Sequence, residues 1–153
     1  MTREEGPIER RMKADSVVAL KAGDKRLTGA LRLYVAALKR ERIDSRAEPT
    51  EDSELAVLSR EKKRREEALE TYETAGRGDL AEQEGFELEA LEQYMPAALG
   101  DDELASLIDE TIAAVGASSP RDMGAVMKQL MPQVAGRADG RRVSDAVRAR
   151  LSG

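Results

Sequence analysis

The sequence predicts an all-α protein, and three observations point to this fold class. The long segments repeat their apolar residues at spacings of three and four, which is the period of an amphipathic helix. No stretch alternates apolar and polar residues for long enough to indicate a strand. Capping residues precede several of these segments and glycines follow them. We therefore expect an amino-terminal domain of about four helices over residues 1–95 and a small three-helix bundle over residues 96–153.

The first two predicted helices lie on either side of Gly23. The first spans about Pro7 to Lys21 and stops at this glycine. Asp24 then caps the second, which runs through KRLTGALRLYVAALKRERI. Between Leu27 and Leu38 its only charged residue is Arg32, so we expect it to be the central and mostly buried helix of the first domain.

The third and fourth predicted helices have apolar stripes that are interrupted by opposite charges. Thr50 caps the third, which runs to the GRG turn, and Asp79 caps the fourth, LAEQEGFELEALEQYM. Acids in the first turn of the third helix favour the helix dipole, namely Glu51, Asp52 and Glu54. The residues that interrupt the two stripes are Lys62, Arg65, Glu84 and Glu87. We expect the two helices to pair antiparallel, with the cations facing the acids.

A break at Pro96 is the expected domain boundary, because proline disfavours helix at the residue before it. After it comes a helix with the sequence DDELASLIDETIAAV, closed by Gly116. Ser119 caps the next helix, which Pro132 ends. The last helix spans about Asp139 to Leu151.

Several kinds of site are excluded by what the chain lacks. Its 153 residues include no Cys and no His, which removes thiolate chemistry, the commonest general base and the commonest transition-metal ligand. The remaining lysines, tyrosines and carboxylates form no nucleophile-base set at readable spacing, so we expect no catalytic residues. No apolar run has the length of a signal peptide or membrane span. We expect a cytoplasmic protein that binds no metal, cofactor or membrane.

Charge is divided unevenly along the chain, although the net value is only −5. Residues 79–119 contain 11 acids and no cation, whereas residues 120–153 contain seven cations and three acids. Within this basic segment Met123, Met127 and Met131 share one helix face, which indicates core packing or an adaptable binding surface. Gly124 inside the same helix suggests that another backbone or a ligand approaches closely.

The stretch QVAGRADGRRVSDAVRARL has the features of a generic anion site. Glycines free the backbone to turn, and Asp139 as cap would leave the first amides of the last helix pointing outward beside arginines. The alternative is an ordinary solvated basic face. The candidate nucleic-acid-binding residues are Lys128, Gly136, Arg137, Gly140, Arg141, Arg142 and Arg148.

These motifs resemble the GatB/YqeY family. The resemblance is strongest in SSPRDMGAVMKQLMP followed by GRADGRRV, and it is supported by LRLYVAALKRERID, REKKRREEALETYETAGRGDLAEQE and LEALEQYMP. The resemblance implies an amino-terminal helical domain and a small carboxyl-terminal helical bundle. The resemblance covers nearly the whole chain. Within the family, the chain is most similar to free-standing YqeY-like proteins.

Related domains form the tail of the B subunit of bacterial glutamyl- and aspartyl-tRNA amidotransferases, where the tail helps to hold the tRNA body. The family is therefore associated with glutamine-dependent carbon-nitrogen ligases. This chain is similar only to the tail and lacks the large domain that activates the tRNA-linked carboxylate. The resemblance thus implies a non-catalytic module that binds tRNA or associates with amidotransferase subunits. The alternative is a protein-interaction adaptor without nucleic acid, in which the acidic segment docks on a basic partner.

Overall fold

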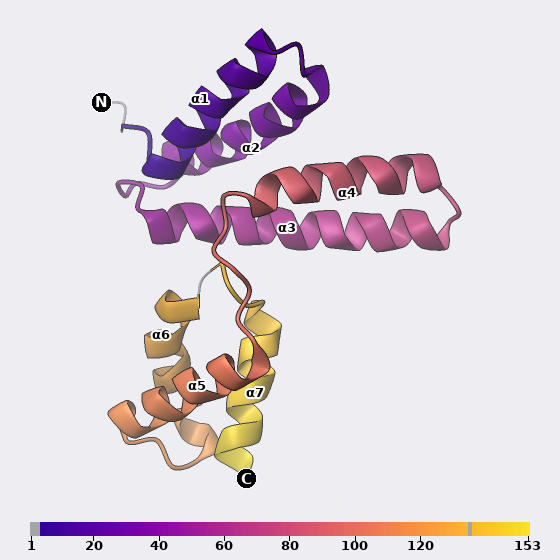
Figure 1. Cartoon of the computed structure of the whole chain (residues 1–153). Helices are drawn as coiled ribbons and strands as arrows, with labels where there is room; N and C mark the ends of the chain where they lie inside the picture. Colours follow the sequence, from indigo (N-terminus) through magenta and orange to yellow (C-terminus); the bar gives the residue numbers. More distant parts are fainter. Residues whose placement is uncertain (1–3, 135) are drawn as a thin grey trace. The chain divides into compact units, whose positions relative to one another are not determined.

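The structure is a computed structural model that describes residues 4–134 and 136–153. The described residues form seven α-helices and one short 3-10 helix, and none of them is in a strand. The all-α prediction is confirmed. The chain divides into two compact units, of which the first ends at Pro96 and the second begins at Ala97 (Figure 1).

The first unit consists of two helical hairpins. One joins α1 (Pro7–Lys21) to α2 (Lys25–Asp44), and the other joins α3 (Glu51–Thr74) to α4 (Gly78–Glu92). Figure 1 shows the two helices of each hairpin side by side. The hairpins pack together through contacts of α2 with α3 and α4 and of α1 with α3.

Local sequence signals account for most helix ends in this unit. The Asp24 carboxylate accepts a hydrogen bond from the Leu27 amide at 3.0 Å, as expected of a cap. Gly23 adopts the left-handed φ of +76° that ends α1. The prediction that Asp79 caps α4 is wrong, because α4 already begins at Gly78 and Asp79 lies in its first turn. There it forms an ion pair with Arg77 at 3.2 Å, and this guanidinium lowers the pKa of the Asp79 carboxyl.

The expectation that α2 is mostly buried is only half right. One side of the helix is buried in the core of the first unit, with Leu31 and Tyr34 almost fully enclosed. The opposite side is open, and Leu33 retains 48% of its exposure. Because α2 contacts α1, α3 and α4 on its inner side, no helix of this unit covers the side that carries Arg32 and Leu33.

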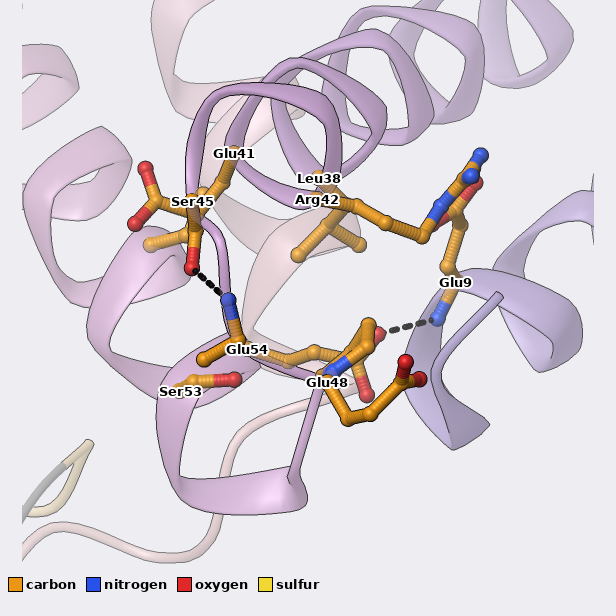
Figure 2. A pocket seen from close by; sticks show the side chains of 11 residues that line it. Glu9, Leu38, Glu41, Arg42, Ser45, Glu48, Ser53 and Glu54 are labelled. Carbon is orange, nitrogen blue, oxygen red and sulfur yellow. Dashed lines mark hydrogen bonds and ion pairs between the residues drawn. The ribbon is translucent and has the colours of Figure 1, made fainter. Parts of the chain in front are cut away.

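A buried carboxylate caps α1 from another helix (Figure 2). Glu54, in the first turn of α3, accepts hydrogen bonds from the amides of Ile8 at 3.0 Å and Glu9 at 2.8 Å. The Glu9 carboxylate in turn forms a buried ion pair with Arg42 of α2 at 2.9 Å. A Cβ at Gly6 would lie 2.4 Å from the Glu54 carboxyl carbon, so glycine leaves room for this cap.

The second unit contains α5 (Asp101–Val115), a 3-10 helix (Pro120–Asp122), α6 (Met123–Val134) and α7 (Gly140–Ser152). The three α-helices contact one another and enclose a separate aliphatic core. The buried residues of this core are Leu99, Leu104, Ile108, Val126, Leu130, Val134, Val143, Val147 and Leu151.

The methionines of α6 favour the core interpretation. All three are half-buried and pack against the aliphatic core of the second unit. Gly124 is exposed, and a Cβ there would meet no atom of the chain within 4 Å, so no close approach within the chain explains it. The prediction that Pro132 ends the helix is wrong, because α6 continues to Val134. Near a helix end, proline removes only the bond to the Lys128 carbonyl and its fixed φ remains helical.

Candidate nucleic-acid interface

The predicted site residues lie on α6, on the connection that follows it and on α7 of the second unit. Gly136 adopts a left-handed φ of +75°, which bears out the expected turn of the backbone. Gly140 instead is the first helical residue of α7. Lys128 lies on the exposed side of α6, and Arg141 is exposed in the first turn of α7.

Arg137 holds two segments of the second unit together. Its Nε donates to the Ala97 carbonyl at 3.0 Å, and its Nη2 lies 3.3 Å from a carboxylate oxygen of Glu103. Its own carbonyl accepts a hydrogen bond from the Leu99 amide at 2.8 Å. These bonds give Arg137 a structural role and use much of the donor capacity of its guanidinium.

Two further arginines of α7 pair with acids of α5. Arg142 donates to the Leu99 carbonyl at 3.0 Å and pairs with Asp101 at 2.6 Å. Arg150 makes a two-point contact with Asp109, with distances of 2.6 and 2.5 Å. This guanidinium lowers the pKa of the Asp109 carboxyl, and the carboxylate raises the pKa of Arg150.

Arg148 also has a partner, because its Nη1 lies 3.1 Å from Asp145 one turn earlier in α7. The basic character of residues 120–153 is therefore largely neutralised by acids of the same unit. Over residues 97–153 the seven cations face eight acids, so the unit carries a net charge of −1. Of the predicted cations, Arg137, Arg142 and Arg148 are not free donors.

The remaining predicted cations are free within the described part of the chain. Neither the Lys128 nor the Arg141 side chain forms a hydrogen bond or ion pair with another described residue. Asp139 precedes α7, but its side chain makes no capping hydrogen bond. The backbone amides of residues 140–142 consequently find no hydrogen-bond acceptor among the described residues. These amides and the Arg141 guanidinium are hydrogen-bond donors that suit an anion. Anion binding at this end of α7 stays a prediction.

Cations in the middle of α3, among them Lys62 and Arg65, pair with acids of α4 inside the first unit. Arg65 pairs with Glu84 at 3.3 Å and also with Glu87. Lys62 lies 3.8 Å from Glu92. The prediction that these cations face the acids of α4 is confirmed, and it explains why both apolar stripes are interrupted.

A second group of free cations lies on the open side of α2, and none of its members is among the site residues predicted from the sequence. Lys25, Arg32, Lys39 and Arg40 are exposed, and none of their side chains has a hydrogen bond or ion pair with another described residue. The sequence carried a signal for this group, because no acid occurs between Lys25 and Arg40.

Neither of the cavities beside α1 has the features of an active site. The cavity around Glu54 has a volume of only about 40 Å³, which is room for no more than a few water molecules (Figure 2). A larger, open cavity of about 500 Å³ lies between α1, α2 and α4. At its rim Tyr94 donates a hydrogen bond to Asp15 at 2.5 Å, and burial together with this carboxylate raises the pKa of Tyr94. Tyr94 is therefore protonated at neutral pH.

The described residues contain neither a metal-binding cluster nor a membrane span. No three acidic side chains among residues 4–134 and 136–153 gather in a way that could hold a metal ion. Within the same ranges, every helix is too short or too polar to cross a bilayer.

Comparison with known proteins identifies the family. The family model for Yqey-like proteins matches residues 9–151, which is nearly the whole chain and includes both units. A search of curated proteins finds no match. The matched range contains the motifs on α2, α3, α4 and α6 that carried the resemblance seen in the sequence. This chain therefore belongs to the YqeY-like family.

Proposed function

We propose that this chain is a non-catalytic helical module that binds tRNA or associates with a tRNA amidotransferase. Membership of the YqeY-like family supports the proposal, because the related tail of the amidotransferase B subunit holds tRNA. The observation that carries it is the uncapped amino end of α7, where free backbone amides lie beside the free Arg141 side chain.

The amino end of α7 is suited to bind the phosphates of tRNA. Backbone amides and a guanidinium both donate hydrogen bonds to anionic oxygens, and the helix dipole adds positive potential. The second unit contains no aromatic residue on which a base could stack. Recognition there would depend on phosphates and on tRNA shape, with little reading of sequence. Arg142 and Arg148 would have to leave their carboxylate partners to bind a phosphate, so we expect them to contribute less to tRNA affinity.

Filter binding of purified protein to tRNA at about 50 and about 200 mM salt tests this proposal. We expect the double variant K128A/R141A to bind less tightly and to show a salt slope that is smaller by about one to two units, because each lost phosphate contact removes about one. A matched control is R60A/R64A, which removes two exposed cations that pair with acids of their own chain. A wild-type chain that fails to bind tRNA at both salt concentrations would exclude tRNA binding and leave only association with an amidotransferase.

A protein-interaction adaptor is the second candidate, and one observation favours it. The most exposed large aliphatic side chains of the described residues all lie on α1 and α2; they are Val17, Val18, Leu20, Leu33 and Ile43. Such a concentration is typical of protein-binding surfaces. The acidic segment is a weak docking surface, because acids of α4 pair with cations of α3 as the sequence predicts. A protein partner that stays bound in nuclease-treated lysate would favour the adaptor over the tRNA module.

A further inference from the structure

We propose that three cations of α2 form a second phosphate-binding surface for tRNA, separate from the amino end of α7. We name this surface the α2 stripe and define it as Lys25, Arg32 and Lys39. The inference takes the nature of the partner from the proposed function, but it rests on a different unit and on different residues.

Helix geometry places the three cations in one row. They are seven residues apart, so each follows the last by almost two turns and rotates by only about 20° around the helix. Neighbouring cations are therefore about 10 Å apart along the axis, and the row is about 21 Å long. The row lies on the side of α2 opposite the buried Tyr34, where no helix of the first unit covers it.

The α2 stripe retains its charge because nothing in the described chain neutralises it. No acid lies three or four residues before or after any of the three cations, so the spacings that favour intrahelical ion pairs are absent. None of them has a hydrogen bond or ion pair with a described residue of another helix. The chain has more acids than cations, 30 against 25, yet its acids pair with cations of α3 and α7 and leave this row free.

Small residues between the cations make the surface accessible. Gly29 and Ala36 share the face of the stripe and are exposed. A Cβ at Gly29 would meet no atom of the chain within 4 Å, so internal packing does not require glycine there. Glycine inside a helix destabilises it relative to alanine. Its presence between two free cations fits a surface that a bulky polyanion approaches closely.

An extended polyanion fits the stripe better than a small anion does. Cations held about 10 Å apart along a rigid helix cannot all converge on one phosphate or carboxylate. Nucleic acid carries a charge on every nucleotide, so successive phosphates can meet successive cations along the row. No aromatic side chain lies on α2 outside its buried side, and recognition would again be of the backbone. An acidic protein segment is the competing partner.

The test measures tRNA binding by the full-length variant K25A/R32A/K39A at about 50 and about 200 mM salt. The matched control is R60A/R64A/R77A, which loses the same charge at exposed cations that pair with Glu41, Glu61 and Asp79. We expect the stripe variant to bind at least about tenfold more weakly at the lower salt, with a salt slope that is smaller by about three units. The control should change both values much less, and circular dichroism should show equal helix content in both variants.

The possible outcomes separate this inference from the proposed function. If wild-type protein binds tRNA and the two triple variants lose affinity equally, the α2 stripe is excluded while a tRNA-binding module remains. If wild-type protein does not bind tRNA, the tRNA-binding part of the proposed function fails first and the inference fails with it. Polyglutamate serves as a competitor at equal charge concentration. Displacement of tRNA by polyglutamate as readily as by unlabelled tRNA would assign the stripe to an acidic protein and overturn the RNA assignment.

Discussion

Single side chains in this protein join helices that are distant in sequence, and Glu54 is the clearest case. Its position in the first turn of α3 predicts an interaction with the dipole of its own helix. In the structure its carboxylate instead accepts the first amides of α1, 46 and 45 residues away. It is 4% exposed, so no water can replace these bonds easily.

Replacing Glu54 by alanine should destabilise the first unit. The change removes a buried cap and leaves two amides without an acceptor, so we expect the free energy of unfolding to fall by about 1 to 3 kcal/mol. Urea unfolding followed by circular dichroism measures this. E70A removes an exposed acid from the same helix and is the control, with an expected change within about 0.5 kcal/mol. Equal stability of the two variants would contradict the capping role.

Pairs of helices in the second unit are aligned by ion pairs that no local pattern reveals. Arg142 pairs with Asp101 and Arg150 pairs with Asp109, so each partner lies 41 residues away. The constant separation means that α5 and α7 run in the same direction over this contact. The same pairs explain why a segment with an excess of cations does not present a uniformly basic face.

The pair between α5 and α7 should give the stability a defined pH dependence. Arg150 lowers the pKa of the Asp109 carboxyl below its ordinary value of 3.8. The ionised carboxylate therefore stabilises the folded state fully at pH values above 3.8, and this stabilisation is lost as the pH falls through the lowered pKa. D109N should therefore unfold at a lower temperature than wild type at pH 7, and the difference should disappear at acid pH.

Thermal unfolding of both proteins between pH 7 and strongly acidic pH checks this expectation. D102N is the control, since Asp102 is exposed and has no ion pair with another described residue. A difference between D109N and wild type that is the same at every pH would show that the effect of the substitution is not electrostatic.

At the scale of the whole molecule, the two units have separate hydrophobic cores. The core of α1 to α4 includes Leu58, and that of α5 to α7 includes Leu130; both side chains are fully buried. Neither core cluster includes a residue of the other unit. Stability should therefore be a property of each unit.

Substitutions in the two cores should act locally. L130A should cost the second unit about 2 to 5 kcal/mol, because it removes buried surface and leaves a cavity. Hydrogen exchange by mass spectrometry should then show faster exchange in α5 to α7 and little change in α1 to α4, whereas L58A should show the reverse. Acceleration of exchange throughout the chain by either variant would mean that the units unfold together.

The sequence by itself determined the helices of this protein and its family. Helix ends depend on contacts within a few residues, such as the Asp24 cap and the left-handed Gly23, and these can be read locally. The predicted start of α4 was wrong because two local signals competed. The chain turns at Gly76, and α4 begins at Gly78, one residue before the acid Asp79 that was expected to cap it. Similarly, the apolar run of α2 correctly predicts a core helix but not its open side.

Only the tertiary structure decided which cations are free. Arg137 and Arg142 were predicted to bind phosphate, but they are held by carbonyls and acids some 34 to 43 residues away. Lys128 and Arg141 from the same prediction remain free, as do the cations of α2 that the prediction left out. The physical reason is that a charge is neutralised by its neighbours in space. These neighbours are determined by the packing of α5 against α7 and of α3 against α4. They cannot be read from the order of residues along the chain.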